Sequence, residues 1–203
     1  MQERLIILSP NRQTDPSSRR QFVRSGLWAG AIVINGGLLE ATPEMPETEP
    51  NIEGPFYKAG APERGVLVEK NLRGTPLTLS GRVLNTQGKP LSGAILDLWQ
   101  ADSEGVYDNE GYRLRGKVRA DGTGRYNIQT IVPRYYSAGS QIRPAHIHFK
   151  VSAAGTPVLT TQLYLSGDPY LDKDKWVRKS LTISPEAARG GKAANFDFVL
   201  RAS

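Results

Sequence analysis

The sequence contains no cysteine and only two histidines among its 203 residues. Without cysteine, the chain cannot build a thiolate zinc site, an iron–sulfur cluster or a disulfide framework. It also lacks the residue that carries the usual lipid anchor of an exported lipoprotein. Any metal site must therefore combine histidine with carboxylate, tyrosine, amide or water ligands.

A strong excess of charge is also missing. The formal net charge is +6, and the lysines and arginines are scattered without a basic stripe or an interleaved aromatic platform. We therefore expect no nucleic-acid partner. The composition, with 38% hydrophobic residues, 21 glycines and 14 prolines, is typical of a loop-rich globular protein with one domain and a short extension.

The N-terminal segment is similar to an export signal. Arg19 and Arg20 precede an uncharged, weakly hydrophobic run at residues 26–39. That run is too short to span a bilayer and suits the hydrophobic region of a signal peptide. A buried helix is the alternative, but the glycines inside the run disfavour helix formation. The paired arginines resemble the twin-arginine export signal of bacteria.

This resemblance divides the chain into three parts. Residues 1–41 are expected to form the signal, with processing near Ala41, and the protein is expected in the periplasm or outside the cell without a stable membrane anchor. Residues 42–52, rich in proline, glutamate and threonine, are expected to form an exposed linker. One domain, residues 53–203, follows the linker. The twin-arginine pathway carries folded proteins, which suits a metal site assembled in the cytoplasm.

The body of the chain has the pattern of an all-β protein. From residue 67 onwards, turn signals interrupt short apolar or alternating runs about every ten residues, which is typical of an antiparallel β-sandwich. The expected strands are residues 77–84, 94–100, 117–120, 125–131, 146–151, 160–165, 177–183 and 196–200. Only residues 184–192 indicate a short helical turn.

The two histidines lie two positions apart in one expected strand. Because side chains alternate faces along a strand, His146 and His148 point the same way, while Ile147, Phe149 and Val151 point towards a core. One face of the strand is therefore a candidate metal site. An isolated pair of this kind is equally compatible with two unrelated surface or hydrogen-bonded histidines.

The surrounding motifs decide between these interpretations. They are, in order, Leu98-Trp99-Gln100-Ala101-Asp102 with Gly105-Val106-Tyr107, Asp121-Gly122 with Gly124-Arg125-Tyr126, Thr130-Ile131-Val132-Pro133, Arg143-Pro144-Ala145-His146-Ile147-His148-Phe149 and Thr160-Thr161-Gln162-Leu163-Tyr164. This ordered set closely resembles the intradiol ring-cleavage dioxygenases, the family of protocatechuate 3,4-dioxygenase and catechol 1,2-dioxygenase. The resemblance extends from about Glu53 to Pro169, and Glu53-Gly54-Pro55-Phe56-Tyr57 is a weaker match at its start.

The resemblance implies four ligands for ferric iron, Fe(3+). The first tyrosine ligand of the family closes the Trp-Gln-Ala…Gly-x-Tyr segment, at Tyr107, and the second lies three residues beyond the Thr-Ile-x-Pro proline, at Tyr136. Family members place a small residue or proline where Tyr135 stands, which favours Tyr136 over its neighbour. Together with His146 and His148, these phenolates suit ferric iron, whereas two histidines with one carboxylate suit ferrous oxygenases.

The implied activity is cleavage of a catechol-type ring between its two hydroxyls, with O2, to a muconate-type diacid. Tyr136 is implied to leave the iron when substrate binds, whereas Tyr107 stays. Arg143 and Gln162 are implied to stabilise negative charge that develops on the substrate ring. Without the family pattern, Arg143 would be an ordinary surface arginine and Gln162 a polar residue of an edge strand.

The implied fold is an antiparallel β-sandwich of the transthyretin (prealbumin) type with long active-site loops. The chain keeps all four ligands, so it resembles either a catalytic subunit or a self-sufficient homo-oligomer. The stretch between Tyr136 and Arg143 is shorter than in familiar protocatechuate enzymes, so the pocket rim must differ. Catechol, protocatechuate and hydroxyquinol all remain candidate substrates.

Two other functions are compatible with parts of the sequence. A non-catalytic β-sandwich binding module would explain the strands and turns but not the tyrosine and histidine set. A different metalloenzyme, using zinc or copper, would use His146 and His148 but would have no need of Tyr107.

Overall fold

The computed structural model describes residues 44–139 and 141–201, and this part of the chain is all-β, without an α-helix. The strands are β1 (Pro76–Asn85), β2 (Ile95–Gln100), β3 (Arg115–Arg119), β4 (Arg125–Ile131), β5 (Tyr136–Ala138), β6 (Gln141–Arg143), β7 (His146–Ser152), β8 (Leu159–Leu165), β9 (Thr182–Ile183), β10 (Glu186–Ala188), β11 (Gly191–Asn195) and β12 (Phe198–Leu200). Two short 3-10 helices, η1 (Leu171–Lys173) and η2 (Lys179–Leu181), follow β8. The expected export signal, residues 1–41, lies outside the described residues.

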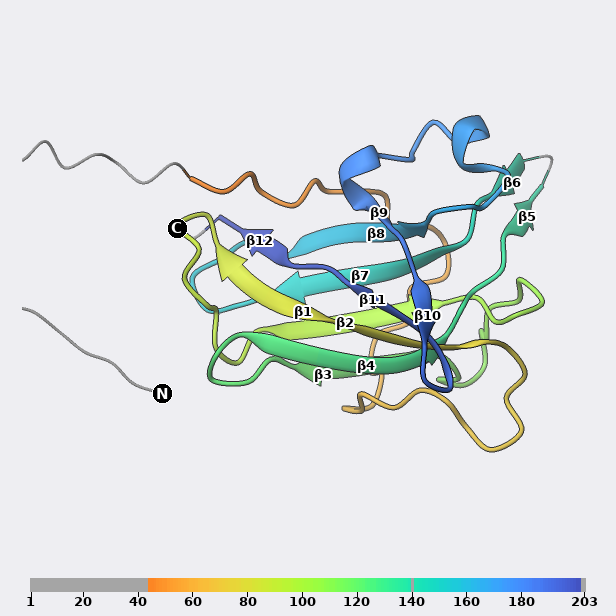
Figure 1. Cartoon of the computed structure of the whole chain (residues 1–203), viewed down its shortest axis with the longest axis horizontal. Helices are drawn as coiled ribbons and strands as arrows, with labels where there is room; N and C mark the ends of the chain where they lie inside the picture. The colour runs from red at the N-terminus through yellow and green to blue at the C-terminus, as the bar shows by residue number, and fades with distance from the viewer. Residues whose placement is uncertain (1–43, 140, 202–203) are drawn as a thin grey trace, which may run out of the picture. The chain divides into compact units, whose positions relative to one another are not determined.

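The strands form two five-stranded sheets and a separate two-stranded sheet, β5–β6 (Figure 1). In the first, β1 lies between β4, which is antiparallel to it, and β11 and β12, which are both parallel to it; β10 flanks β11. The second, here called the β7 sheet, has the order β3-β2-β7-β8-β9. The expected β-sandwich is confirmed, but its sheets are mixed, because β9 also runs parallel to β8.

Most expected strands are present, with small shifts at their ends, but two predictions are wrong. The strand expected at residues 177–183 contains the 3-10 helix η2, and only its last two residues, β9, pair with β8. The helical turn expected at residues 184–192 is part of the β10–β11 hairpin. Alanine favours helices locally, but the pairing of β11 along β1 outweighs that preference. The β5–β6 hairpin was not predicted, because its strands are too short to show a period.

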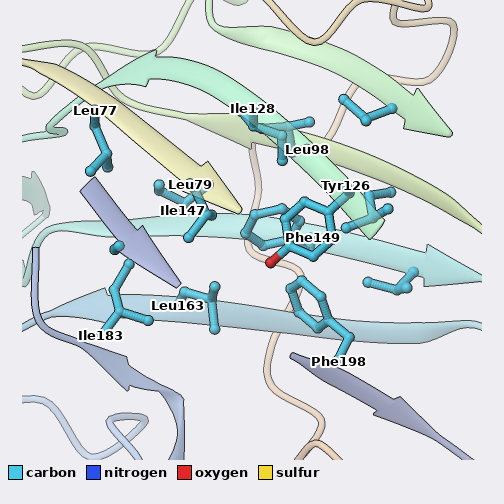
Figure 2. Packing of buried hydrophobic residues seen from close by; sticks show 14 of the residues in the cluster. Leu77, Leu79, Leu98, Tyr126, Ile128, Ile147, Phe149, Leu163, Ile183 and Phe198 are labelled. Carbon is cyan, nitrogen blue, oxygen red and sulfur yellow. The ribbon is translucent and has the colours of Figure 1, made fainter. Parts of the chain in front are cut away.

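The hydrophobic core fills the space between the sheets (Figure 2). Leu79 of β1 faces it from one sheet, and Ile147 and Phe149 of β7 face it from the other. The ring of Phe149 lies 5.0 Å from that of Phe198. Because Ile147 and Phe149 point inwards, the two histidines of β7 must point to the outer face of the β7 sheet. The alternation predicted for this strand is confirmed.

The segment before the sandwich, residues 44–57, is here called the N-terminal strap. Most of its first residues are exposed, but hydrogen bonds tie the segment to the sandwich. The Met45 amide donates to Thr86 O (2.7 Å), the Thr48 amide to Val199 O (3.0 Å) and the Asn51 amide to Thr160 O (2.8 Å). These bonds guide the strap along β12 and β8 towards the outer face of the β7 sheet. No helix in the described part of the chain has the length and apolarity needed to cross a membrane.

Candidate metal centre

A row of side chains crosses the outer face of the β7 sheet. Strand pairing places Arg115 of β3 opposite Trp99 of β2, and Trp99 opposite His148 of β7. His148 in turn lies opposite Gln162 of β8. Directly opposed residues of paired strands share a face. Strand register therefore brings four residues that are far apart in the sequence to one side of the sheet.

The two histidines are buried and meet through their ring nitrogens. Nε2 of His146 lies 3.0 Å from Nε2 of His148. Nδ1 of His146 lies 2.6 Å from Pro144 O, and since a carbonyl oxygen can only accept, Nδ1 carries the proton and Nε2 keeps its lone pair. A backbone carbonyl thus orients this imidazole with Nε2 free to bind a metal, as is usual for metal-binding histidines.

Two tyrosines complete this cluster. Tyr107 lies in the loop between β2 and β3, and Tyr136 is the first residue of β5; both are buried. The Tyr107 ring lies 5.3 Å from that of Tyr136 and 6.2 Å from that of His148. The Tyr136 ring lies 5.7 Å from that of His146. Gly105 has a φ of +84°, and a Cβ there would lie 2.5 Å from Tyr135 O, so this close approach of the two tyrosine segments requires glycine.

The N-terminal strap covers the cluster from outside. The ring of Phe56 stacks on Tyr107 at a centroid distance of 4.2 Å and an interplanar angle of 13°. Gly54 has a φ of +69°, and a Cβ there would lie 3.4 Å from Cε1 of His148. On the sheet side, the Trp99 ring stacks on His148 at 4.7 Å. Aromatic rings and strap backbone therefore exclude water from the histidine and tyrosine side chains.

Arg143 and Gln162 form a buried network beside the histidines. Nε of Arg143 donates to Oδ2 of Asp174 (2.5 Å), and its Nη2 donates to Oε1 of Gln162 (2.9 Å). Gln162 Oε1 also accepts from the Tyr164 hydroxyl (2.9 Å), and its Nε2 donates to Ile52 O of the strap (2.6 Å). Arg143 lies directly opposite Tyr136 in the β5–β6 hairpin. The guanidinium is thus held between a carboxylate and an amide, on the strand next to Tyr136.

Burial sets the protonation states of the four candidate ligands. It lowers the pKa of His146 to about 3, with a further contribution from the charge of Arg143, and it also lowers the pKa of His148, helped by its histidine neighbour. Burial raises the pKa of Tyr107 well above its ordinary value; Tyr136 adds to this rise, while Arg143 and Arg115 oppose it. The histidines are therefore neutral and ready to bind a metal, whereas the tyrosines need a cation to become phenolates.

The structure brings all six predicted site residues into this one region. Tyr135, the competitor of Tyr136, instead places its ring 4.6 Å from that of Tyr170, away from the histidines. Sequence reasoning missed Asp174, Tyr164 and Phe56. Tyr164 was within reach of a prediction, because it lies two residues after Gln162 and so shares its face of β8. Nothing local in the sequence connects Asp174, in the loop after η1, with the arginine it binds.

The donor set fits a metal ion. The two Nε2 atoms, 3.0 Å apart, are close enough to bind a single ion. The hydroxyl of Tyr107 and Nδ1 of His148 are buried without a hydrogen-bond partner in the described structure. Within the same residues, no group of three or more histidine, aspartate or glutamate side chains can hold a metal. The two buried tyrosines of the cluster are therefore candidates for further ligands.

Comparisons with known proteins agree with the geometry. The sequence profile of a family described as Dioxygenase matches residues 52–202. The 6-chlorohydroxyquinol 1,2-dioxygenase of Cupriavidus pinatubonensis is 31% identical over 217 residues, which cover 95% of this chain and 78% of that protein. Catechol 1,2-dioxygenase 2 of Acinetobacter lwoffii is 38% identical over 149 residues, and the match covers 63% of this chain and 54% of that protein. The chain thus spans about half the length of some curated relatives.

A solved structure extends the agreement to the fold. It is the dioxygenase domain of a dioxygenase carbohydrate-binding protein fusion from the cellulolytic bacterium Streptomyces sp. SirexAA-E. That domain matches with a TM-score of 0.73 and 40% sequence identity, over 78% of this chain and 100% of that one. Because the family profile covers most of the chain and its relatives are 1,2-dioxygenases of catechols and hydroxyquinols, the chain belongs to the intradiol ring-cleavage dioxygenase family.

Proposed function

We propose that this protein is a ferric-iron intradiol dioxygenase that opens a catechol-type ring between its hydroxyls, using O2, and releases a muconate-type diacid. The observation that carries the proposal is the buried convergence of Tyr107, Tyr136, His146 and His148 in a chain without cysteine. These four residues would hold the iron. When bound, ferric iron would withdraw electron density from the catecholate and make a ring carbon reactive towards O2.

The protein side chains then perform three tasks. The stacked rings of Phe56 and Trp99 shield the site from water, which strengthens every electrostatic interaction inside it. Arg143, fixed by Asp174, offers a permanent positive charge to the negative charge that develops on the substrate. One N–H of the Gln162 amide is occupied by Ile52 O, so its second N–H is the donor left for the substrate.

Tyr136 is proposed to accept a proton. A catechol that binds as a dianion loses two protons. The phenolate oxygen of Tyr136 would take one of them, and the other would pass to solvent. Arg143 lies opposite Tyr136 in the hairpin, and its charge opposes the rise that burial causes in the Tyr136 pKa. Arg143 thus favours the tyrosinate form of Tyr136 in the substrate-free protein and faces the substrate once it is bound.

The substrate is proposed to be a single-ring catechol: catechol, protocatechuate or hydroxyquinol. The names of the relatives, which include catechol, chlorocatechol and hydroxyquinol 1,2-dioxygenases, support this class. Oxygen uptake should therefore be measured with each of the three substrates in parallel. Uptake with none of them, by protein that contains iron, would contradict the proposed substrate class.

Metal analysis and the visible spectrum test the proposed cofactor. Purified protein is expected to contain iron in equimolar amount and to be coloured, because ferric tyrosinate has an intense charge-transfer band. Zinc protein and a metal-free binding module lack that band. Colourless, iron-free protein after reconstitution with ferric salt would contradict the proposal.

We also propose export by the twin-arginine pathway, followed by assembly into a homo-oligomer. Changing Arg19 and Arg20 together to lysine is expected to leave folded, active protein in the cytoplasm. Normal export of this double variant would show that residues 1–41 are a general secretory signal or part of the fold. Light scattering of the exported protein measures the oligomeric state.

A further inference from the structure

The role of Arg115, which the proposed function does not use, can be argued from its surroundings. Its side chain is only 1% exposed, although it belongs to the start of β3 at the end of a loop. Among residues 44–139 and 141–201, no carboxylate lies within ion-pair distance of its guanidinium. Arginine is rarely buried to this extent without an ion pair, so a function for this side chain is sought among its neighbours.

The guanidinium binds both segments that enclose Tyr107. Its Nε and Nη2 donate to Asp108 O (3.0 and 2.8 Å), the carbonyl of the residue directly after Tyr107. Its Nη1 donates to Phe56 O (2.6 Å), the carbonyl of the residue whose ring stacks on Tyr107. Arg115 therefore fixes the tyrosine through its own loop on one side and through the N-terminal strap on the other.

The backbone before Arg115 is held in an unusual conformation. Leu114, which is buried, has a φ of +55°, a left-handed value that is uncommon for any residue other than glycine. Such backbone persists only where the surrounding structure enforces it. Here it directs the chain into β3 at the register that places Arg115 opposite Trp99, on the face that carries His148.

We propose that Arg115 is a positioning residue for the metal ligand Tyr107, which it holds in place through the backbone carbonyls of Asp108 and Phe56. This inference rests on the proposed ferric function. It accounts for a buried guanidinium whose three hydrogen bonds go to backbone carbonyls on either side of Tyr107.

Nitration of the metal-free protein tests the positioning. Tyr107 is buried, so tetranitromethane followed by peptide mapping should leave it unmodified in the wild type and in Arg115→Lys. Arg115→Met should make Tyr107 reactive, while Tyr126, buried between the sheets, stays protected and reports an intact sandwich. Arg64→Met is the matched control, because Arg64 also binds carbonyls of this loop, at Tyr112 and Arg115, but does not bind the segments around Tyr107.

The visible spectrum of iron-loaded protein tests the position of Tyr107 in the presence of the metal. A displaced phenolate overlaps less with the metal, so the charge-transfer band of Arg115→Met should weaken and shift. Arg115→Lys should restore most of the wild-type position. In a Tyr107→Phe background, Arg115→Met should cause no further shift, because the coupled partner is gone. If Arg115→Met does not fold, Arg115→Gln replaces it with the same expectations.

Two results would overturn the inference: Tyr107 protected in folded Arg115→Met, or the same band shift with and without Tyr107. Both results can be distinguished from the result that would contradict the proposed function. A wild type that binds no ferric iron would contradict that function, while nitration would still decide whether Arg115 positions Tyr107.

Discussion

The buried ion pair between Arg143 and Asp174 offers a quantitative prediction for Asp174→Asn. The two side chains are 5% and 0% exposed, and Nε of Arg143 lies 2.5 Å from Oδ2 of Asp174. Asparagine keeps the size of the residue and can still accept the Trp176 amide at Oδ1, which Asp174 accepts at 2.8 Å. The substitution therefore removes the charge with little change in shape.

The expected cost follows from leaving a buried cation without its counter-ion. Removing one partner of a buried pair destabilises proteins by about 3–5 kcal/mol. For a chain of this size, each kcal/mol lowers the melting temperature by roughly 2–4 °C, so a decrease of about 6–20 °C is expected. Arg143→Met in the same chain as Asp174→Asn should recover part of that loss, because the unpaired charge is then gone.

Thermal and urea unfolding of the metal-free protein measure this effect, and ring cleavage by the iron-loaded protein measures its functional consequence. kcat should fall more than KM rises, because Arg143 acts on charge that develops after substrate binds. Glu63→Gln, which removes an exposed ion pair with Arg119, is the control. It should change neither the stability of the metal-free protein nor the kinetics of ring cleavage. An Asp174→Asn protein as stable as the wild type would refute the reasoning that Asp174 neutralises Arg143.

The remaining predictions concern the metal ligands. His148→Ala should remove most of the iron and the colour while the sandwich stays folded, since the other face of β7 carries the core. Metal analysis measures the iron, and circular dichroism measures the fold. An unchanged visible spectrum would contradict the assignment of His148 as a ligand. Tyr107→Phe should disturb the spectra of the resting protein and of the anaerobic catechol complex. Tyr136→Phe should change mainly the resting spectrum, because substrate displaces that ligand. Tyr135→Phe should leave both spectra unchanged, and a changed resting spectrum would place the second tyrosine ligand one residue earlier.

Much of the candidate site could be predicted because its signals are local. His146 and His148 share a face as a direct result of strand geometry, and the apolar residues between and after them identify the opposite face as the core. Tyr107, Tyr136, Arg143 and Gln162 depended on the ordered motifs of a family. The structure brings these six residues together, while their roles remain predictions for the experiments above.

The errors arose where local preference and long-range pairing disagree. The segment at residues 184–192 contains a short Glu-Ala-Ala-Arg run that favours a helix locally, yet β11 pairs with β1 at four positions and becomes a strand. The strand expected at residues 177–183 is reduced to β9 beside β8. In both cases the decisive partner lies far away in the sequence.

The sequence by itself determined which side chains alternate, where turns can form, and that no cysteine takes part in the chemistry, because these follow from covalent geometry and residue type. Only the tertiary structure decided which residues meet. Strand register placed Arg115, Trp99 and Gln162 in one row with His148, and a loop after η1 brought Asp174 to Arg143. Register and loop closure depend on the packing of the whole core, so no short segment contains that information.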